Sequence, residues 1–231
     1  MPMQSASKAV VLTEKANGGL TATVRERLEQ MILGGRIKAG ERLTETALAN
    51  QLNVSRGPVR EATRLLAEAG LVTMVPNRGA FVRKVSLEDV LHVYDVRAGL
   101  ARAAGRLAAM RITADQLAGL KDLLNRMESA RMSLDSDAYI EANRAFHAGI
   151  VEATANPRLA DFHQATEREL FMFTRRGVLG QRRMDQSNKE HARIMEALAG
   201  GDEQNAACAF ENHVLAGKQR MLDTLSWRES S

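Results

Sequence analysis

The stretch NVSRGPVREATR, residues 53–64, constrains the fold more than any other part of this sequence. Three arginines recur in it every four residues: Arg56, Arg60 and Arg64. On a helix, residues four apart are rotated by only about 40° from one another around the axis, so these arginines form one basic stripe. The apolar residues fall on the opposite side: Val59, Ala62, Leu65 and Leu66. Ser55 suits a helix N-cap, and Pro58 is tolerated in a first turn. The pattern predicts a short helix suited to a DNA groove, although a solvated basic face on an ordinary helix would look the same.

The flanking segments place this helix in a larger pattern. A loose tail is expected over 1–20, and an amphipathic helix is expected to begin near Thr21 or Thr23 and to stop at Gly34-Gly35. Thr44 then caps a second short helix, the arginine helix ends at Gly70, and the β-like segments 71–75 and 80–82 flank the turn residues 76–79. Three helices followed by a hairpin predict a winged helix-turn-helix over 21–83, with the third helix in the major groove and the hairpin as the wing.

The remainder of the chain, residues 84–231, contains only helical patterns. Ser86 with Asp89, and Thr113 with Gln116, are capping signals. Helices are expected from Ser86 to about Arg111, from Thr113 onward, and over about 136–154, 157–176, 185–199 and 202–226. Turn residues separate them at Asn156-Pro157, Gly177–Gly180 and Gly200-Gly201. The fold class is therefore mainly α, an N-terminal winged helix-turn-helix followed by an antiparallel all-α bundle of about six helices.

Charge and composition limit the functional classes. Residues 1–83 hold 12 Lys and Arg against seven Glu, although the chain of 231 residues has a net charge of only +4. Only the front part is therefore expected to meet a polyanion. The single cysteine, Cys208, excludes an intrachain disulfide, no apolar run approaches a membrane span, and no signal-peptide core is present. A cytoplasmic protein is expected.

The residues of the front part carry a family resemblance. Leu43-x-Glu45, Leu48-Ala49, Val54-Ser55-Arg56-x-Pro58-Val59-Arg60-Glu61-Ala62 and Asn77-Arg78-Gly79 resemble the DNA-binding domain of GntR-family transcription regulators. The helical part resembles the effector domain, called FCD, of the FadR-type branch, and the six helices are similar to its shorter, VanR-like group. The signs are Val96-Arg97, Phe146-His147, Glu190-His191 with Ile194, and His213.

The resemblance implies a homodimeric regulator, a repressor or an activator, and we expect a repressor. It binds a palindromic operator through two winged domains, and a small molecule acts through the helical domain. The DNA-contacting residues that the resemblance implies are Ser55, Arg56, Gly57, Pro58 and Arg60, with Asn77, Arg78 and Gly79 at the wing tip. Arg56 or Arg60 suits a bidentate hydrogen bond to guanine, and Ser55 with the helix N-terminal amides suits phosphate.

Three histidines fall on helical faces that should turn inward: His147, His191 and His213. Asn143 precedes His147 by four residues and shares its face. Buried imidazoles need a partner, and a divalent metal would satisfy them, so these four residues are the candidate ligands. Each histidine alone could instead be a hydrogen-bonded core residue. Zinc fits the ligand types, with nickel or manganese as alternatives. Metal-binding relatives usually offer Asp where this chain has Asn143, which should weaken the site.

Arg97 shares a stripe with Val90, Tyr94 and Ala101, so its guanidinium needs an anionic partner. Two partners are possible: a carboxylate of the core, or the carboxylate of a small organic acid beside the metal. His92 and His163 do not belong to the pattern of the candidate metal ligands and are expected to be surface or structural residues.

Two other functions compete with this one. A metal-dependent enzyme would use the same ligand number, but no general base and no HExxH motif accompany the histidines. A DNA-binding protein with a purely structural bundle would need neither a buried histidine cluster nor a buried arginine. We therefore expect a ligand-responsive regulator that is not an enzyme and has no membrane partner.

Overall fold

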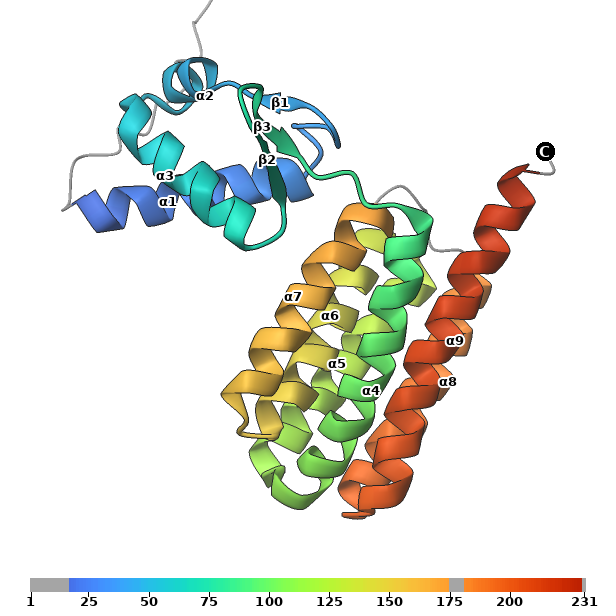
Figure 1. Cartoon of the computed structure of the whole chain (residues 1–231). Coiled ribbons are helices and arrows are strands. Elements are labelled where there is room, and N and C mark those ends of the chain that lie inside the picture. The colour runs from blue at the N-terminus through green and yellow to red at the C-terminus, as the bar shows by residue number, and fades with distance from the viewer. Residues whose placement is uncertain (1–16, 175–180, 230–231) are drawn as a thin grey trace, which may run out of the picture. The chain divides into compact units, whose positions relative to one another are not determined.

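The computed structural model describes residues 17–174 and 181–229, and the chain divides into two compact units, residues 1–85 and 86–231 (Figure 1). The predicted boundary after residue 83 lies two residues before this division. The first unit contains helices α1 (Asn17–Leu33), α2 (Glu45–Leu52) and α3 (Arg56–Glu68), and strands β1 (Arg42–Leu43), β2 (Val72–Val75) and β3 (Gly79–Val82).

Helix α1 begins at Asn17, four residues before the predicted start, so the expected loose tail over 1–20 is wrong for its last residues. The sequence Asn17-Gly18-Gly19 has poor helix propensity, which suggested a loop. Propensity is a weak prior that tertiary packing overrides. Further along the helix Val24 and Leu28 are fully buried and anchor it against the unit's core.

The hairpin is the predicted one, but the sheet is larger than predicted. Strand β3 pairs antiparallel with β2 and also with β1, which gives the order β1-β3-β2. The sequence predicted no strand between Gly34-Gly35 and Thr44, so β1 was not expected. A strand of two residues has too little alternation to be read from sequence. The strand nevertheless contributes to the core of the unit, because Leu43 is buried opposite Ala80.

Helices α2 and α3 form the helix-turn-helix. Helix α2 ends at Leu52 and is capped by Asn53, whose backbone is left-handed with φ 54° and ψ 48°, a conformation that asparagine tolerates better than most residues. Ser55 then stands in extended conformation as the N-cap of α3, as predicted. Val59, Ala62 and Leu66 point into the core of the unit and are fully buried, which confirms the apolar face.

The second unit is a bundle of helices, six in the part of the chain that is described, as the sequence predicted (Figure 1). They are α4 (Leu87–Arg111), α5 (Ala114–Ser133), α6 (Ser136–Ala153), α7 (Pro157–Thr174), α8 (Gln181–Ala199) and α9 (Glu203–Glu229). Ser86 with Asp89 and Thr113 with Gln116 form complete capping boxes at the starts of α4 and α5. The turn predicted at Gly177–Gly180 lies outside the described residues.

Small residues allow α4 to lie close to α9. Four alanines and a glycine of α4 are buried: Ala98, Ala101, Ala104, Gly105 and Ala108. A Cβ added to Gly105 would stand 2.3 Å from the carbonyl oxygen of Ala206, so the backbones of the two helices meet there. This contact fixes α9, and with it one of the three inward-facing histidines, against the rest of the bundle.

Candidate functional site

Two groups of residues were predicted to carry function, and the structure places one in each unit. The first is the outer face of α3. Arg56, Arg60 and Arg64 lie on it with side chains 61%, 66% and 57% exposed. The predicted arginine stripe is therefore on the surface, opposite the buried apolar face. Arginines buried in the core would have ruled out contact with a nucleic acid.

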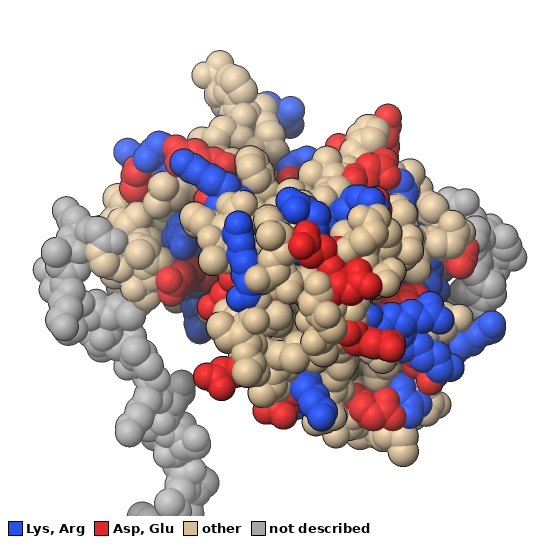
Figure 2. Space-filling model, turned by 90° about the horizontal axis from the view of Figure 1, so that it is seen from below, with Lys and Arg blue, Asp and Glu red and all other residues tan. Residues whose placement is uncertain are grey.

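Each arginine of this stripe has an acidic partner, which the sequence analysis did not anticipate. Arg60 is hydrogen-bonded to Glu45 of α2, and Arg56 lies 3.6 Å from the same carboxylate. Arg64 is paired with Glu61 and Glu68 of its own helix. The stripe is thus charge-compensated rather than strongly cationic. On the face drawn in Figure 2, too, basic and acidic side chains are interspersed, and neither sign forms a continuous field.

The first turn of α3 is open to an approaching partner. The Ser55 side chain makes no capping hydrogen bond to the helix. No atom of the described residues lies within 4 Å of a Cβ placed on Gly57, and Pro58 occupies the third helical position, where the missing N–H costs nothing. Backbone amides at a helix N-terminus favour an anion, so this turn suits a phosphate.

The wing tip is a tight turn between β2 and β3. The backbone of Asn77 is left-handed with φ 60°, Gly79 has φ 98°, and the amide of Arg78 donates to the carbonyl oxygen of Val75 at 3.0 Å. Asparagine and glycine accept positive φ at least cost, which explains their presence here. Arg78 itself is exposed at the tip.

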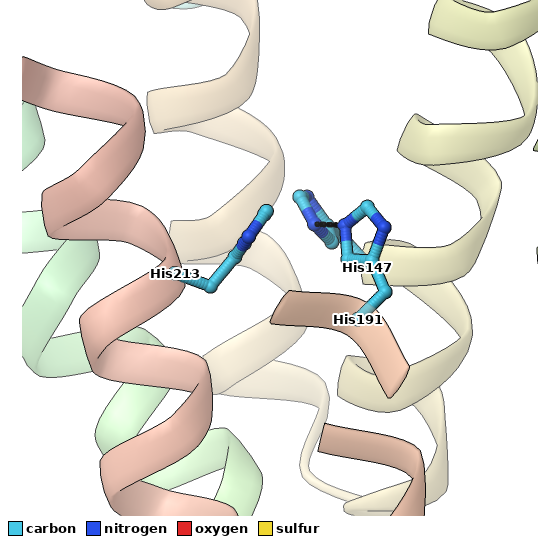
Figure 3. Close-up of side chains that lie close together, drawn as sticks. All are labelled: His147, His191 and His213. Carbon is cyan, nitrogen blue, oxygen red and sulfur yellow. Dashed lines mark hydrogen bonds between the residues drawn. The ribbon is translucent and has the colours of Figure 1, made fainter. Parts of the chain in front are cut away.

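The second group lies inside the helical unit. His147 of α6, His191 of α8 and His213 of α9 are all buried and point toward one another (Figure 3). One ligand atom from each lies within 4.8 Å of the others, and the Nε2 atoms of His147 and His191 are 3.3 Å apart. Zn–N bonds of about 2.0–2.1 Å at a tetrahedral angle would separate two nitrogens by about 3.3–3.4 Å. The spacing of this pair fits such a centre.

The surroundings of the three imidazoles keep them in the neutral form that binds a metal. Burial lowers the pKa of His147 well below its usual value, and the charges that His213 and His191 would carry lower it further. Burial likewise lowers the pKa of His191, with contributions from His213 and Arg220. For His213, burial lowers the pKa although Glu190 opposes the shift. Neutral imidazole is the ligand form.

Glu190 orients the third histidine. Its Oε2 lies 2.7 Å from Nδ1 of His213, and Arg220 donates to both of its oxygens at 2.6 and 2.9 Å. Burial raises the pKa of Glu190, but the hydrogen bonds from His213 and Arg220 outweigh it, so the carboxylate stays charged. A charged acceptor holds the proton of His213 on Nδ1 and leaves Nε2 as the ligand atom. The sequence analysis noted Glu190 only as part of the family resemblance.

Asn143 is half-buried one helical turn before His147 on α6. Among the His, Cys, Asp and Glu residues of the described chain, the metal-type cluster contains the three histidines and no carboxylate. A metal bound here would therefore take no negative charge from the protein's nearest ligands. The amide oxygen of Asn143 is the remaining candidate, as the sequence suggested.

Arg97 is buried and has found a partner within the core. Its Nη1 donates to Glu167 of α7 at 2.6 Å, and the two side chains are only 7% and 17% exposed. Of the two partners considered from the sequence, the core carboxylate is thus present. Nε of Arg97 is buried without a hydrogen-bond partner among the described residues, so the guanidinium is not fully satisfied.

Glu167 is the centre of a small buried network. Arg144 lies 3.7 Å from its Oε1 and His163 lies 4.0 Å from its Oε2. Burial raises the pKa of Glu167, but the charge of Arg97 and its hydrogen bond, followed by His163 and Arg144, bring it below its usual value. His163 is therefore a buried structural residue, whereas His92 is exposed. His163 lies one turn before Glu167 on α7. Arg97 and Arg144 come from α4 and α6, which meet α7 only in the fold, so these two partners could not be found from sequence.

A winged helix-turn-helix joined to a second, helical unit is the architecture of a DNA-binding transcription regulator. Matches of the sequence to models of known protein families support the same class. The family described as "Bacterial regulatory proteins, gntR family" matches residues 20–82, and the FCD domain matches residues 92–216. The chain belongs to the GntR family of transcription regulators and carries the FCD type of helical domain. This family consists of regulators rather than enzymes, and its members bind operator DNA.

Curated relatives cover most of the chain. An uncharacterized HTH-type transcriptional regulator, YdhC, of Bacillus subtilis is 31% identical over 82% of this chain and 84% of its own length. The Nta operon transcriptional regulator of Aminobacter aminovorans is 31% identical over 84% of this chain and 91% of its own. A probable D-xylose utilization operon transcriptional repressor of Paenarthrobacter nicotinovorans is 29% identical over 93% and 92%.

Solved structures share the fold. McbR/YncC of E. coli superposes with a TM-score of 0.71 and 24% identity over 92% of this chain and 99% of that protein. A putative GntR regulator from Rhodococcus sp. RHA1 gives the same TM-score and identity over 89% and 98%. No helix in the described ranges has both the length and the apolar character needed to cross a membrane.

Proposed function

We propose that this chain is a ligand-responsive transcription regulator whose helical domain binds a divalent metal and a small organic acid. The observation that supports this most is the convergence of His147, His191 and His213 in the core of the regulatory domain. His213 has Glu190 as a partner. The Nε2 atoms of His147 and His191 meet each other, but Nδ1 of His191 is buried without a hydrogen-bond partner among the described residues, which is costly. A bound cation supplies the interaction that offsets the cost of burying them.

The metal would be held by the three histidines, with Asn143 as a fourth ligand. Zinc suits this donor set best, and nickel or manganese would suit it less well. Glu190 would act through His213 by fixing its tautomer and orientation. Because Asn143 brings an oxygen without a charge, we expect weaker binding than a carboxylate at this position would give. The metal would supply a positive charge and open coordination positions to the regulatory ligand.

The regulatory ligand would be a small carboxylate bound by Arg97 beside the metal. The buried Nε of Arg97 that lacks a partner supports this, since a carboxylate could bridge Nε and one Nη. Glu167 already holds Nη1, so the ligand would bind beside it on Nε and Nη2 and place a second negative charge next to Glu167. The repulsion between the two carboxylates would loosen the link between α4 and α7 and re-pack the bundle, and the change would reach the winged domain through residues 82–86.

The DNA-binding surface would comprise the first turn and outer face of α3 together with the wing tip. Arg56 or Arg60 would read a base, and Ser55, Gly57 and Pro58 would lie against phosphate. The wing-tip residues Asn77, Arg78 and Gly79 would contact the neighbouring backbone. A palindromic operator fits a homodimer. Val96 and Met110 of α4, which are 57% and 53% exposed, support a further helix packing there.

The proposal also covers whether the protein represses or activates transcription and to which branch of the family it belongs. We infer a repressor of the FadR-type branch, in its VanR-like group, that works in the cytoplasm where the chromosome lies. The naming of one relative as a probable repressor and the six helices of the described regulatory domain support these inferences. The competing possibility, a purely structural bundle, draws its support from the Arg97–Glu167 pair.

Elemental analysis combined with native mass spectrometry tests the metal site. The purified wild-type protein should carry close to one divalent ion per chain, and His191→Ala should lose it. His92→Ala is the matched control, because His92 is exposed and should leave the metal content unchanged. Equal metal content in His191→Ala and the wild type would dismiss the site. The same spectra report the subunit number and any co-purified acid.

Selection from a random pool of DNA duplexes tests the DNA-binding face. The wild-type protein should enrich a palindromic sequence, and Arg60→Ala should lose the preference for it while keeping its melting temperature. Arg126→Ala on α5 removes the same charge from an exposed position of the helical domain and serves as the control. A retained preference in Arg60→Ala would exclude Arg60 from the recognition surface.

A further inference from the structure

The carboxylate of Glu45 stands between two arginines of the recognition helix. Glu45 is the first residue of α2, and its Oε1 and Oε2 accept hydrogen bonds from Nε of Arg60 at 3.1 and 3.2 Å. Its Oε2 also accepts from Nη2 of Arg60 at 3.2 Å, and Nη2 of Arg56 lies 3.6 Å away. One acid thus contacts both arginines for which base reading is proposed.

A negative charge at this place is unfavourable for binding DNA in general. Affinity for a duplex comes largely from neutralising phosphates, and an acid among the contacting arginines repels them. An exposed ion pair also contributes little to folding stability. An acidic residue in the first turn of α2 does stabilise the helix dipole, but that role does not require the side chain to reach α3. The hydrogen bonds between Glu45 and Arg60 therefore need another explanation.

The geometry leaves one recognition edge of Arg60 free. A guanidinium has a side edge formed by Nε and Nη2 and an end edge formed by Nη1 and Nη2, and either can donate two parallel hydrogen bonds. Glu45 holds the side edge. The end edge remains available, and its two N–H groups match the O6 and N7 acceptors of guanine. Held in this way, Arg60 has fewer orientations to lose when it meets a base.

We infer that Glu45 is a positioning residue for sequence discrimination, which fixes the guanidinium of Arg60 so that its end edge reads a guanine. The inference rests on the proposed recognition face. It implies that Glu45 lowers the affinity for random DNA while it raises the preference for the operator. A residue that only supported the fold would change both affinities together through the fraction of folded protein.

The test compares two duplexes, the selected operator and a scrambled sequence of equal length, by fluorescence anisotropy at a fixed salt concentration. In Glu45→Ala, we expect the ratio of the two affinities to fall about fivefold to tenfold, a part of what one bidentate arginine–guanine pair contributes. The affinity for the scrambled duplex should rise. Glu45→Gln removes the charge but retains an oxygen that can accept a hydrogen bond from Arg60. It should therefore also bind the scrambled duplex more tightly than the wild type does, while its ratio of operator to scrambled affinity should lie between those of Glu45→Ala and the wild type.

Glu61→Gln is the control. It removes the same charge from α3, where Glu61 pairs with Arg64 instead of Arg60. It should raise both affinities together and leave their ratio unchanged. An unchanged ratio in Glu45→Ala, or an equal fall in Glu61→Gln, would overturn the positioning role. A wild-type protein that does not distinguish the two duplexes would instead contradict the proposed function, and the positioning role with it.

Discussion

The three inward-facing histidines should make the metal-free protein sensitive to acid. Their pKa values are lowered in the folded state, so below the usual pKa of about 6.5 the unfolded chain binds more protons than the folded chain. The stability they contribute is therefore present above about pH 6.5 and is lost as the pH falls toward the folded values. Each such histidine contributes up to about 1.4 kcal/mol per pH unit to the slope.

Urea unfolding in the presence of a chelator, between pH 5 and 7.5, measures this slope. His163, whose pKa burial also lowers, adds to the slope equally in the wild type and in both variants, whereas the lowered pKa values of Glu190 and Glu167 act at more acidic pH. His147→Gln should give a shallower slope, and His92→Gln should keep the wild-type slope because His92 is exposed. A free energy of unfolding that does not fall between pH 7 and 5 would contradict the buried, neutral state of these side chains.

Glu190 should matter to metal affinity although it is not placed as a ligand. Glu190→Gln keeps the shape but removes the charge that holds the proton of His213 on Nδ1, and loss of such a partner typically weakens metal binding about 10–100-fold. Competition with a fluorescent zinc chelator measures the change. Glu196→Gln, an exposed position on the same helix, should leave the affinity unaltered. If Glu190→Gln binds zinc as tightly as the wild-type protein does, Glu190 does not support the metal site.

At the scale of elements, the contact between α4 and α9 can be probed at one glycine. Alanine is favoured over glycine in a helix by about 1 kcal/mol, but a Cβ at Gly105 would overlap the backbone of Ala206 and Ala207. Over-packing costs about 1–3 kcal/mol, and backbone atoms cannot move aside as a side chain can. We expect Gly105→Ala to lower the free energy of unfolding, measured in urea.

Gly119→Ala on α5 is the control for this substitution. An added Cβ meets no atom within 4 Å there, so only the helix propensity changes, and the protein should become more stable by about 0.5–1 kcal/mol. A gain in stability for Gly105→Ala as well would show that α4 and α9 are not packed backbone to backbone.

The elements that sequence predicted well are those with local signals. The capping boxes at Ser86 and Thr113 fixed two helix starts, and the spacing of the apolar residues on α3 fixed its buried face. Strand β1 has no local signal, because its two residues are held by pairing with β3. The acidic partners of Arg60, Arg97 and His213 were likewise hidden, since each comes from a helix that the arginine or histidine meets only after folding.

For the candidate site, the sequence was sufficient to choose the histidines but not to describe their surroundings. Helical spacing and the family resemblance together selected His147, His191 and His213, and the structure brings all three together. The role of Asn143 stays a prediction, as does the binding of an effector by Arg97. The pairing of Arg97 with Glu167 shows why composition and spacing were insufficient: they showed that a partner was needed but not which one.

At the scale of the whole molecule, the chain consists of two units that each have their own core. The winged unit carries the surface proposed to bind DNA, and the helical unit carries the buried histidines and Arg97. A regulator needs these two sites to be coupled, and coupling is reciprocal: a ligand that weakens DNA binding must itself bind less well to the DNA complex. Because of this reciprocity, the coupling can be measured from either site.

The most direct measurement is the affinity for the selected operator at a buffered free zinc concentration, with a panel of small carboxylates added to saturation. We expect at least one acid to shift the dissociation constant of the wild-type protein for the operator by about 5–150-fold, the usual range of such coupling. The shift should be lost in His191→Ala, which lacks a ligand of the metal. An operator affinity that stays the same with and without zinc and with every acid would contradict a ligand-responsive regulator.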